Sequence, residues 1–488
     1  MNNTEYSRQD GGTINIHIPE QATKQLAIQK TSDGKRKLVV STNWLPLFGF
    51  EKDTRVIERL IGDGNEGITI TPANDALDFS KTKKVYSRQY KTRKNNPLET
   101  LLHIHGQKLL DAAFPAGTER VHILFRKNEI RITPVRNRAA ERVEKAIKAL
   151  EQGEIMTAFS ACTAGIDAMS LTDEGFQVQS ILEWRPNEAR DNQDFTETGA
   201  LNAVANIPVK HIFNEDIGAV DLGLLSKCVK ESPSTLLQIS LQCDEFSNVK
   251  AKKLKDLALD DLSSSADMVY DGLRLIETVN PACVLLEQVP GFMTSQAGSL
   301  FETKLRKWGY HVHKAVMDSR DHGGLTSRKR FYLFATSLPS EFAWPADSAR
   351  KDTPIWNEFI APVLHTLRDV THTKSMQDGL TCGRLRVIDR DSTCSPTFLK
   401  SQMRQAKDSV VIRDGDRLLF PTVELMQALM MIPDRFSTDA VSMTVASEII
   451  GQSVDFTLHS RIIAAIAEHI RAFADKILPQ SLPQLQAA

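Results

Sequence analysis

The stretch Leu236–Ser247, LLQISLQCDEFS, is the part of the sequence around which the fold can be worked out. Its first six residues form an apolar run of about the length of one buried strand, and a polar break follows. Cys243 comes directly after this break, so a thiol lies where a sheet ends and a loop begins. Open α/β sheets bind ligands at this edge, outside the carboxyl ends of their strands. A single cysteine beside a strand is more often a small buried hydrophobe than a nucleophile, so the segments around it decide its role.

Length and composition are those of a globular protein of two or three domains. Of the 488 residues, 41% are hydrophobic and 25% are charged, which excludes wholesale disorder. The net charge is -1, so any affinity for nucleic acid must come from local charge. No apolar run is long enough to span a bilayer, and the polar start lacks a signal-peptide core, so we expect no membrane partner and a cytoplasmic location.

The cysteines show neither a CxxC pair nor the spacing of a metal site. The sequence therefore predicts free thiols and no bound metal. The six cysteines are Cys162, Cys228, Cys243, Cys283, Cys382 and Cys394.

The first third of the chain predicts a small domain that is mainly β. Residues 1–20 are polar, and we expect them to be flexible. Between residues 21 and 135, short apolar runs are separated by turns, and apolar residues at helical spacing then predict a connecting helix over residues 136–153. The expected strands are residues 38–40, 55–58, 67–71, 121–125 and 129–132, the last two as a hairpin.

A basic segment, KTKKVYSRQYKTRK at residues 81–94, is the strongest candidate for a nucleic-acid contact in this domain. It contains no acid, and two tyrosines, Tyr86 and Tyr90, lie between its cations. Cations neutralise phosphates and rings stack on bases, although a solvated basic loop is an equally good interpretation. The cations proposed to bind nucleic acid are Lys83, Lys84, Arg88, Lys91 and Arg93.

This domain resembles the small swapped-hairpin DNA-binding domains of the AbrB and SymE type. The resemblance depends on LPLFGFEKDTRV, residues 45–56, which stands where those domains have a hydrophobic turn before a strand. It implies that double-stranded DNA is a partner and that a homodimer forms through this domain.

From residue 155 onward, apolar strands alternate with helical stretches, the pattern of a parallel sheet with helical crossovers. Residues 254–279 are helical in composition. The predicted fold class is therefore α/β. The expected strands are residues 155–159, 178–182, 236–241, 282–286 and 330–335.

Taken in order, segments between residues 155 and 475 resemble the cytosine-5 DNA methyltransferase family. They correspond to a Phe before a glycine-rich turn, the nucleophile motif, Glu-Asn-Val, Gln-x-Arg-x-Arg, Arg-x-Leu-Thr-Pro-x-Glu and Gly-Asn-Ser-Val. The resemblance implies a Rossmann-like sheet that uses S-adenosyl-L-methionine, with a small target-recognition region. The matching segments are AFSACTAGIDA (158–168), QCDEFS (242–247), LLEQVPGF (285–292), TSRKR (326–330), RLLFPTVE (417–424) and GQSV (451–454).

The same resemblance assigns contacts to the cofactor. Glu183, at the end of the second strand, corresponds to the acid that accepts hydrogen bonds from the ribose diol, as in dinucleotide folds. Asp216 corresponds to the acid that meets the adenine amino group. The implied cofactor-binding residues are Phe159, Ser160, Ala161, Thr163, Ala164, Gly165, Glu183, Trp184, Asp216, Ile217, Gln452, Ser453 and Val454.

The catalytic assignments follow from the chemistry of cytosine. C5 is a poor nucleophile, so its methylation needs transient covalent activation by a thiolate that adds to C6. Cys243 corresponds to that nucleophile, and Glu287 to the carboxyl that stabilises the charge developing at N3. Arg330, with Arg328, would hold the base or lower the pKa of the thiol. Because a paired base cannot reach such a site, it must be flipped out of the duplex.

Several residues depart from the family pattern. Asp244 places a carboxyl beside the thiol, which would raise the thiol pKa. Gln288 and Gln452 replace Asn and add a methylene each while keeping the amide. The usual glycines of the first turn are Ala161, Thr163 and Ala164. These changes are compatible with full activity, slow turnover or an altered transferred group.

The resemblance also divides the larger part of the chain. We expect a catalytic domain over residues 154–339, a target-recognition region over 340–395, a return to the catalytic domain over 396–475 and a tail over 476–488. The function implied is a DNA (cytosine-5)-methyltransferase of the restriction-modification kind. The alternatives are an RNA cytosine-5 methyltransferase and a weakly active or inactive methyltransferase-like DNA-binding regulator.

Overall fold

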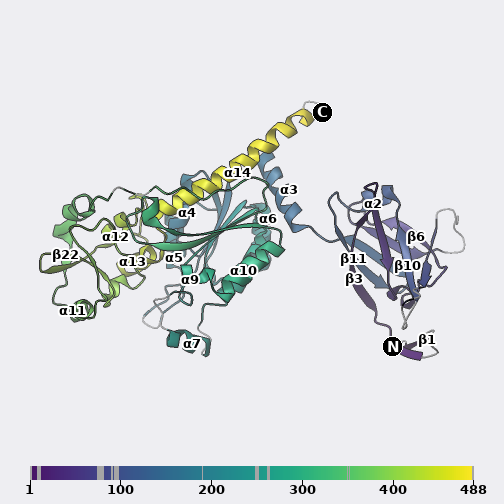
Figure 1. Cartoon of the computed structure of the whole chain (residues 1–488), viewed down its shortest axis with the longest axis horizontal. Helices are drawn as coiled ribbons and strands as arrows, with labels where there is room; N and C mark the ends of the chain where they lie inside the picture. Colours follow the sequence, from purple (N-terminus) through teal and green to yellow (C-terminus); the bar gives the residue numbers. More distant parts are fainter. Residues whose placement is uncertain are drawn as a thin grey trace. The chain divides into compact units, whose positions relative to one another are not determined.

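The structure of the chain is a computed structural model that describes residues 3–7, 13–73, 82–89, 92, 98–188, 191–247, 252–260, 264–348, 350 and 352–485. It divides into two compact units, Met1–Glu141 and Arg142–Ala488 (Figure 1), and each is described by itself. Helix α3 (Arg138–Glu151) contains the boundary between them. Of the helices within the described ranges, none is long and apolar enough to cross a membrane.

The first unit is built from two sheets around one core. The six-stranded sheet has the order β3-β11-β12-β7-β6-β8, and the four-stranded sheet has the order β4-β5-β10-β9. The strands of the first are β3 (Gln21–Ala27), β11 (Arg120–Arg126), β12 (Glu129–Pro134), β7 (Ile68–Pro72), β6 (Arg55–Leu60) and β8 (Lys83–Lys84). Those of the second are β4 (Gln29–Lys30), β5 (Arg36–Ser41), β10 (Leu98–Ile104) and β9 (Tyr86–Gln89).

Alternation of buried and exposed residues explains why these strands pair. In β11, Val121, Ile123 and Phe125 point into the core, while the residues between them are more exposed. In the other sheet, β5 and β10 bury alternate residues in the same cluster. Two short helices, α1 (Trp44–Leu47) and α2 (Gln107–Ala113), also pack on this core.

The N-terminal segment differs from the expectation of a flexible polar stretch. Strands β1 (Asn3–Ser7) and β2 (Thr13–His17) pair antiparallel as a separate two-stranded sheet.

The second unit contains a seven-stranded sheet with the order β15-β14-β13-β16-β17-β19-β18. The chain runs from β13 outward through β14 to β15, then returns to the other side of β13 with β16 and β17, so the topological switch lies between β13 and β16. This confirms the predicted α/β fold class. The strands are β13 (Thr157–Ala161), β14 (Gln177–Leu182), β15 (His211–Phe213), β16 (Leu236–Ser240), β17 (Cys283–Gln288), β18 (His311–Asp318) and β19 (Lys329–Thr336).

The sequence pattern predicted a parallel sheet, and one strand departs from that arrangement. β19 lies between β17 and β18 and is antiparallel to both. β18, which was not predicted, alternates partly exposed polar and apolar residues, so it lacks a continuous apolar run.

Both faces of the sheet are covered, and each helps to form its own core. In β17, Cys283 and Leu285 point to one face, and Val284 and Leu286 to the other. The first face packs on α3, α4 (Ile166–Asp173), α5 (Thr198–Asn206) and α14 (Phe456–Leu485). The second packs on α6 (Leu222–Glu231), α8 (Met268–Val279), α9 (Pro290–Met293) and α10 (Gln296–Lys307). Figure 1 shows α14 and α10 on opposite sides of the sheet.

Outside the main sheet, a smaller one has the order β20-β23-β22-β21 and a cluster of its own that includes Val411 and Phe420. Its strands are β20 (Arg368–Asp369), β21 (Arg386–Ile388), β22 (Val410–Asp414) and β23 (Arg417–Phe420). It therefore continues beyond residue 395, where the small region was expected to end. The remaining helices are α7 (Lys252–Asp260), α11 (Lys374–Thr381), α12 (Val423–Leu429) and α13 (Met443–Gln452).

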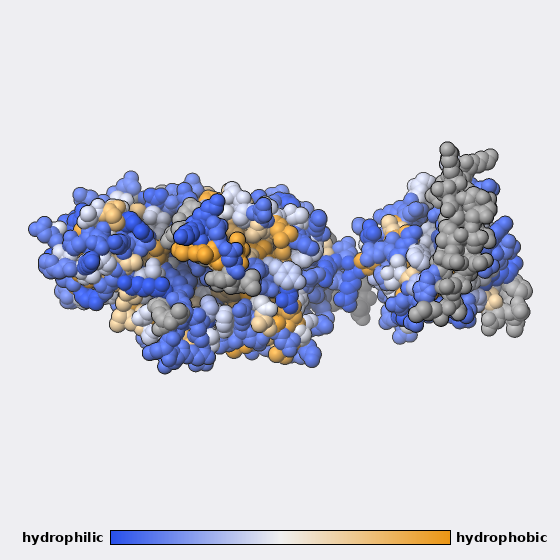
Figure 2. Space-filling model, turned by 90° about the horizontal axis from the view of Figure 1, so that it is seen from below, coloured by the Kyte–Doolittle hydropathy of each residue, from blue (hydrophilic) through white to orange (hydrophobic). Residues whose placement is uncertain are grey.

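The surface of this unit is mainly hydrophilic on the face drawn in Figure 2, with hydrophobic residues gathered in parts of it. Helix α7 contributes three exposed leucines, Leu254, Leu257 and Leu259. The stretch 254–279, expected to be helical, is thus divided between α7 and α8.

Candidate active site

Three neighbouring strands bring polar side chains together at one edge of the main sheet. Ser240 is the last residue of β16 and pairs in register with Glu287 of β17. Glu287 in turn pairs with Tyr332 of β19. Because β19 is antiparallel, its first residues lie at the carboxyl end of β17, and this direction places Arg330 beside Glu287.

The carboxyl of Glu287 has a defined donor on each oxygen. Arg330 Nε lies 2.8 Å from Oε1, and Ser240 Oγ donates to Oε2 at 2.7 Å. The side chains of Glu287 and Arg330 are only 11% and 15% exposed. A pair this shielded is held by charge-assisted bonds rather than by a loose surface contact. The structure thus brings Glu287 and Arg330 together as a rigid pair.

Cys243 lies three residues beyond the end of β16, in a tight turn. The backbone N–H groups of Phe246 and Ser247 both donate to its carbonyl at 3.0 Å. The thiol is close enough to the polar group to interact electrostatically with Arg330, Glu287 and Arg328. The structure therefore places the predicted nucleophile and the predicted carboxyl in one site.

The pKa of the Cys243 thiol is raised from its ordinary value, chiefly because the side chain is buried. Arg330 opposes this shift and lowers the pKa, while Glu287 and Asp244 raise it. The predicted direction of the Asp244 effect is confirmed, although burial is the larger cause. Gln242 Nε2 also donates to Asp244 Oδ2 at 2.9 Å, so this carboxyl is held beside the turn.

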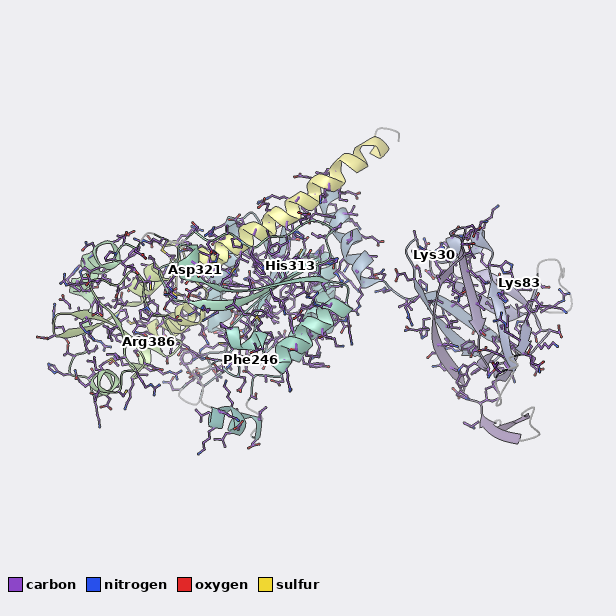
Figure 3. The ribbon with its side chains drawn as sticks, viewed as in Figure 1. Lys30, Lys83, Phe246, His313, Asp321 and Arg386 are labelled. Carbon is purple, nitrogen blue, oxygen red and sulfur yellow. The ribbon has the colours of Figure 1, made fainter. Side chains whose placement is uncertain are left out.

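Two contacts fix the Cys243 turn against the start of α9. The ring of Phe246, labelled in Figure 3, meets Phe292 edge to face with centroids 4.9 Å apart. Gly291 lies so close that an added Cβ would be 2.3 Å from the Phe246 carbonyl oxygen. Glycine is therefore required here by close approach of two backbones.

Gln288 reaches back to the same loop. Its Nε2 donates to the Leu241 carbonyl at 2.7 Å, and its Oε1 accepts from the Val289 N–H at 2.9 Å. The longer amide therefore keeps the hydrogen-bonding capacity that the family's Asn provides and uses it to join β17 to the end of β16.

Arg328 is placed differently from Arg330. It is 1% exposed, and its guanidinium donates to the carbonyls of Phe398, Gly451 and Gln452 at 3.0–3.3 Å. Burial lowers its pKa to about 9, which leaves it cationic at neutral pH. Since both terminal nitrogens of the guanidinium donate to backbone oxygens, Arg328 ties the GQSV loop to the site, and its effect on the thiol is electrostatic.

The candidate cofactor loop follows β13, next to the topological switch. Cys162 and Ala164 have φ values of 62° and 49°, the left-handed region that glycine prefers, and Gly165 has 101°. The chain thus adopts a glycine-like turn without the usual glycines, at about 1 kcal/mol for each non-glycine residue. Ser160 Oγ and Thr163 Oγ1 are 3.0 Å apart and brace the turn.

Glu183 closes this loop from the end of β14. Its Oε2 accepts from the Ala164 N–H at 3.0 Å, and Gly199 packs so near that a Cβ there would lie 2.6 Å from Oε1. Burial raises the pKa of Glu183, while the N–H groups of Ala164 and Thr163 lower it. The carboxyl is therefore held by the loop that would surround a cofactor.

The other predicted cofactor residues lie in β13, after the ends of β14 and β15, and in residues 451–454. Phe159 stacks on Phe213 at 6.3 Å, and Ile217 is buried in the same apolar cluster. Asp216 is half-buried, and its Oδ1 accepts from the Gly218 N–H at 2.9 Å. Ala161 is buried and Trp184 is half-buried. In the GQSV loop, Ser453 and Val454 are buried while Gln452 is exposed.

Three polar residues of the site were not singled out from the sequence. Ser240 holds Glu287, as described above. Asp167, buried in the first turn of α4, interacts with Glu287 and Glu183, and its pKa is raised mainly by burial. Asp455 accepts from Thr326 Oγ1 at 2.7 Å, and burial raises its pKa to about 6. These three residues reach the site through strand register and the course of the chain, and no local sequence motif indicates them.

The predicted basic segment is used differently from the expectation. Lys83 Nζ pairs with Glu58 Oε2 at 2.6 Å, and Lys84 Nζ with Asp53 Oδ1 at 3.1 Å, so these two cations are neutralised by acids outside the segment. Figure 3 labels Lys83 in the first unit. Arg88 is exposed on β9. Lys91 and Arg93 lie outside the described residues.

Fold and site together define the class of protein. The main sheet is a doubly wound α/β sheet. On one side of its topological switch lies the loop after β13, which the Glu183 carboxyl closes, and on the other side lie the Cys243 thiol and the Glu287 carboxyl. Enzymes of the α/β class bind their ligands at this edge of the sheet.

Comparison with known proteins gives a family match over part of the chain. A sequence model described as C-5 cytosine-specific DNA methylase matches residues 229–389, which include Cys243, Glu287 and Arg330. The predicted resemblance to the cytosine-5 DNA methyltransferases is confirmed. The chain is also similar to the type II methyltransferase M.MspI of a Moraxella species, with 28% identity over 296 residues, or 56% of this chain and 65% of the relative. It is 25% identical over 249 residues to M.BsuFI of Bacillus subtilis, covering 48% of this chain and 58% of that protein.

Solved structures give a weaker likeness. The Dnmt2 methyltransferase of S. pombe aligns with a TM-score of 0.49 and 16% identity, over 64% of this chain and 98% of that one. The Entamoeba histolytica methyltransferase EhMeth aligns with a TM-score of 0.49 and 15% identity, over 64% and 97%.

Proposed function

We propose that the chain is a DNA (cytosine-5)-methyltransferase that uses S-adenosyl-L-methionine. The observation that carries the proposal is the convergence of Cys243, Glu287 and Arg330 at the carboxyl edge of one sheet, within the region that matches the family. M.MspI and M.BsuFI are type II methyltransferases, and a restriction-modification role is proposed on that basis.

The residues around the β13 turn fit the proposed cofactor. Glu183 supplies a carboxylate for a ribose diol, Asp216 supplies one for an amino group, and the Phe159–Phe213 pair forms an apolar wall. The left-handed turn at Cys162 and Ala164 keeps the backbone open for close approach. When bound, S-adenosyl-L-methionine supplies an electrophilic methyl group. Phe159, Glu183 and Asp216 bind and orient it in this proposal, together with the GQSV loop.

The reaction begins at the thiol. Cys243 Sγ, as thiolate, forms a bond to C6 of a flipped-out cytosine, and the electron pair of the C5–C6 double bond moves onto the ring. The Glu287 carboxyl in its protonated form gives a proton to N3 as charge builds there. With the methyl donor bound, C5 would take the methyl group as the methyl–sulfur bond breaks and its electron pair stays on sulfur, and the C5 proton would then pass to water. Finally the electron pair of the C5–H bond restores the double bond, the Sγ–C6 bond breaks, and N3 returns its proton to Glu287.

Arg330 has two effects in this scheme. Its charge lowers the thiol pKa and so opposes burial, and its bond to Oε1 fixes the direction of the Glu287 carboxyl. Arg328 is a positioning residue, because its guanidinium joins the GQSV loop to the strand that carries Arg330.

We further propose that the smaller sheet, β20 to β23, with the segment before it from residue 340, reads the target sequence. Base contacts specify a sequence, whereas contacts to phosphate position the protein. This sheet has its own small core, which can support loops of variable sequence.

The test is sequencing of host or plasmid DNA for 5-methylcytosine, with the wild-type gene and with Cys243→Ala. We expect methylated cytosines in one short sequence context with the wild type only. Unmodified DNA in both strains would contradict the proposal. Methyl transfer to structured RNA in preference to duplex DNA, measured in the same purified reaction, would instead support an RNA enzyme.

A further inference from the structure

One side of helix α5 packs on the candidate cofactor loop, residues 162–165. Gly199, Asn202 and Ala203 of this helix are buried, and Asn206 is half-buried. Positions three, four and seven residues apart lie on the same side of a helix, so these four residues form one stripe. The stripe consists of small and amide side chains, which allow a close approach to the loop and can bond to its backbone.

The helix and the loop are in direct contact at two points. A Cβ added to Gly165 would lie 2.9 Å from the Ala203 Cα, so the two backbones touch there. Asn202 Nδ2 donates to the Ala164 carbonyl at 3.1 Å. The amide of Asn202 thus links α5 to the loop by a hydrogen bond.

Ala164 is held from both of its backbone polar groups. Its N–H donates to Glu183 Oε2, and its carbonyl accepts from Asn202. The φ of Ala164 is 49°, in the left-handed region that is unfavourable for a residue with a Cβ. The two hydrogen bonds stabilise this conformation, which a glycine would adopt at little cost. Asn202 therefore supports a loop shape that the sequence of the loop itself disfavours.

The burial of Asn202 argues that this bond is the reason for the amide. The side chain is fully buried, and its Oδ1 has no hydrogen-bond partner among the described residues. A buried acceptor without a partner costs free energy. Leucine has the same number and branching of side-chain heavy atoms and would avoid that cost. The packing of α5 alone therefore does not require an amide at this position, whereas the Ala164 carbonyl does.

We propose that Asn202 is a positioning residue for the methyl donor. Its amide holds the Ala164 carbonyl and thereby keeps the loop after β13 in the shape in which Glu183 can reach a ribose diol. The inference rests on the proposed function, because it takes S-adenosyl-L-methionine as the group that the loop surrounds. Asn202 touches no reacting atom. Its loss therefore weakens cofactor binding and leaves the rate at saturating cofactor nearly unchanged.

The test compares Asn202→Leu with Asn206→Leu in the full-length protein. Asn206 lies one turn further along α5, where its Nδ2 donates to the Ser437 carbonyl and its Oδ1 accepts from the Ser437 N–H, both at 2.8 Å. It therefore holds a different loop and is the matched control. The measurements are binding of S-adenosyl-L-methionine by calorimetry, the Tm, and methyl transfer to duplex DNA over a range of cofactor concentrations.

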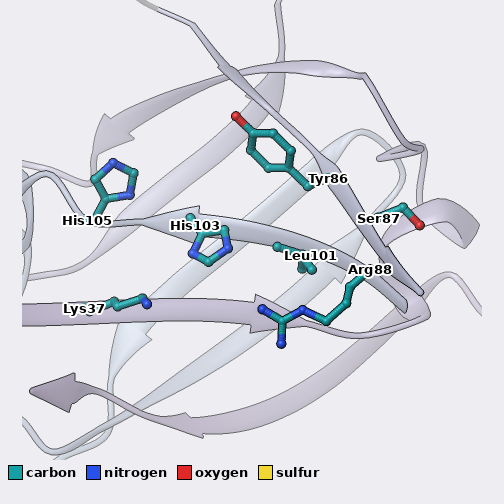
Figure 4. A pocket seen from close by; sticks show the side chains of 7 residues that line it. All are labelled: Lys37, Tyr86, Ser87, Arg88, Leu101, His103 and His105. Atoms are coloured by element: carbon teal, nitrogen blue, oxygen red, sulfur yellow. The ribbon is translucent and has the colours of Figure 1, made fainter. Parts of the chain in front are cut away.

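A pocket in the first unit requires a control of its own. It has a volume of about 600 Å³ and lies on β5, β9 and β10, with the ring of Tyr86 in its lining (Figure 4). An aromatic ring can stack on a planar group such as adenine. Tyr86→Leu should bind the cofactor as the wild type does, because we assign the cofactor to the loop after β13. A loss of affinity in Tyr86→Leu equal to that in Asn202→Leu would overturn the proposal.

A second measurement needs no cofactor. Cys162 lies in the same loop, is half-buried and is close enough to Glu183 and Asp216 to interact electrostatically with both. Alkylation of the Cys162 peptide, followed by mass spectrometry, should be faster in Asn202→Leu than in the wild type, because the released loop exposes the thiol. Asn206→Leu should react at the wild-type rate. Equal rates for Asn202→Leu and wild type would show that the loop does not depend on Asn202.

We expect Asn202→Leu to weaken cofactor binding about tenfold, the effect of one lost hydrogen bond, with kcat and Tm near those of the wild type. Asn206→Leu should show the reverse pattern, a lower Tm and unchanged affinity. Unchanged cofactor affinity in Asn202→Leu, or equal losses in the two variants, would overturn the proposal. A wild-type protein that binds no S-adenosyl-L-methionine would contradict the proposed function, while the alkylation of Cys162 would still decide whether Asn202 holds the loop.

Discussion

The substitution Glu287→Gln should separate the two effects of this carboxyl, because it keeps the shape of the side chain and removes its charge. Glu287 accepts from Arg330 Nε at 2.8 Å and from Ser240 Oγ at 2.7 Å, one donor on each oxygen. The amide has one oxygen, which can face Arg330 while its NH₂ donates to the Ser240 hydroxyl. One charge-assisted bond becomes neutral, and we expect the free energy of unfolding to fall by about 1 kcal/mol. The variant should therefore fold.

The effects on thiol reactivity and on turnover should have opposite signs. Glu287 raises the pKa of Cys243, so its neutral replacement should lower that pKa and increase the thiolate fraction at a given pH. Alkylation of Cys243 by iodoacetamide should become faster. Methyl transfer should fall by about 10² to 10⁴, the usual contribution of a positioned general acid. A merely structural role for Glu287 would not produce this divergence.

The assay follows alkylation of the Cys243 peptide by mass spectrometry over a pH series, beside single-turnover methyl transfer to duplex DNA. Asp244→Asn is the matched control, since Asp244 also raises the thiol pKa and has no assigned proton transfer. It should speed alkylation without slowing methylation. The reasoning is refuted if Glu287→Gln retains methyl transfer within about threefold of wild type, or if its alkylation slows.

Three further substitutions test other parts of the site. Gly291→Ala should lower methyl transfer at least about tenfold through displacement of the Cys243 turn, because its Cβ would lie 2.3 Å from the Phe246 oxygen; unchanged turnover would show that the turn has room to move. Glu183→Ala should weaken S-adenosyl-L-methionine binding, measured by calorimetry, by about tenfold or more, because burial leaves the Ala164 N–H dependent on that acceptor. Glu183→Gln should retain part of the affinity. Equal affinities for wild type and Glu183→Ala would remove Glu183 from the cofactor site. Burial raises the pKa of Asp455 to about 6. Between the pKa of the unfolded chain and pH 6, the folded protein therefore holds a proton that the unfolded chain has lost. The free energy of unfolding should fall as pH rises through this range, by about 3 kcal/mol in all. Asp455→Asn should lack this decline in urea unfolding measured from about pH 4 to pH 7, and parallel curves for the two proteins would contradict the assignment.

Much of the main sheet could be predicted because its strands are buried on both faces. β13, β14, β16, β17 and β19 are buried along most of their length, and each was expected within two residues of its observed start. β15 has only three residues, and β18 is an edge strand with partly exposed polar positions, so neither gave an apolar signal. An apolar run also does not indicate whether its strand is parallel or antiparallel to its neighbours. The antiparallel course of β19 therefore became visible only in the structure.

Some residues of the candidate site could likewise be predicted from the sequence, and others could not. Cys243, Glu287 and Arg330 were found because each occupies a strand end within a motif that resembles the family. Ser240 was missed because its contact with Glu287 depends on the register of β16 and β17, which neither sequence reveals alone. The pairing of Lys83 with Glu58 was missed for a related reason, since the acid lies 25 residues earlier on a neighbouring strand.

The central claim is that Cys243 Sγ forms a transient bond to C6 of an extruded cytosine. It is tested most directly with duplex DNA in which 5-fluorocytosine replaces the target, incubated with S-adenosyl-L-methionine and analysed by denaturing electrophoresis and peptide mapping. Fluorine at C5 blocks the final elimination, so we predict a stable protein–DNA adduct attached through Cys243 and absent in Cys243→Ala. No adduct with the wild-type protein, or an adduct that persists in Cys243→Ala, would contradict the account.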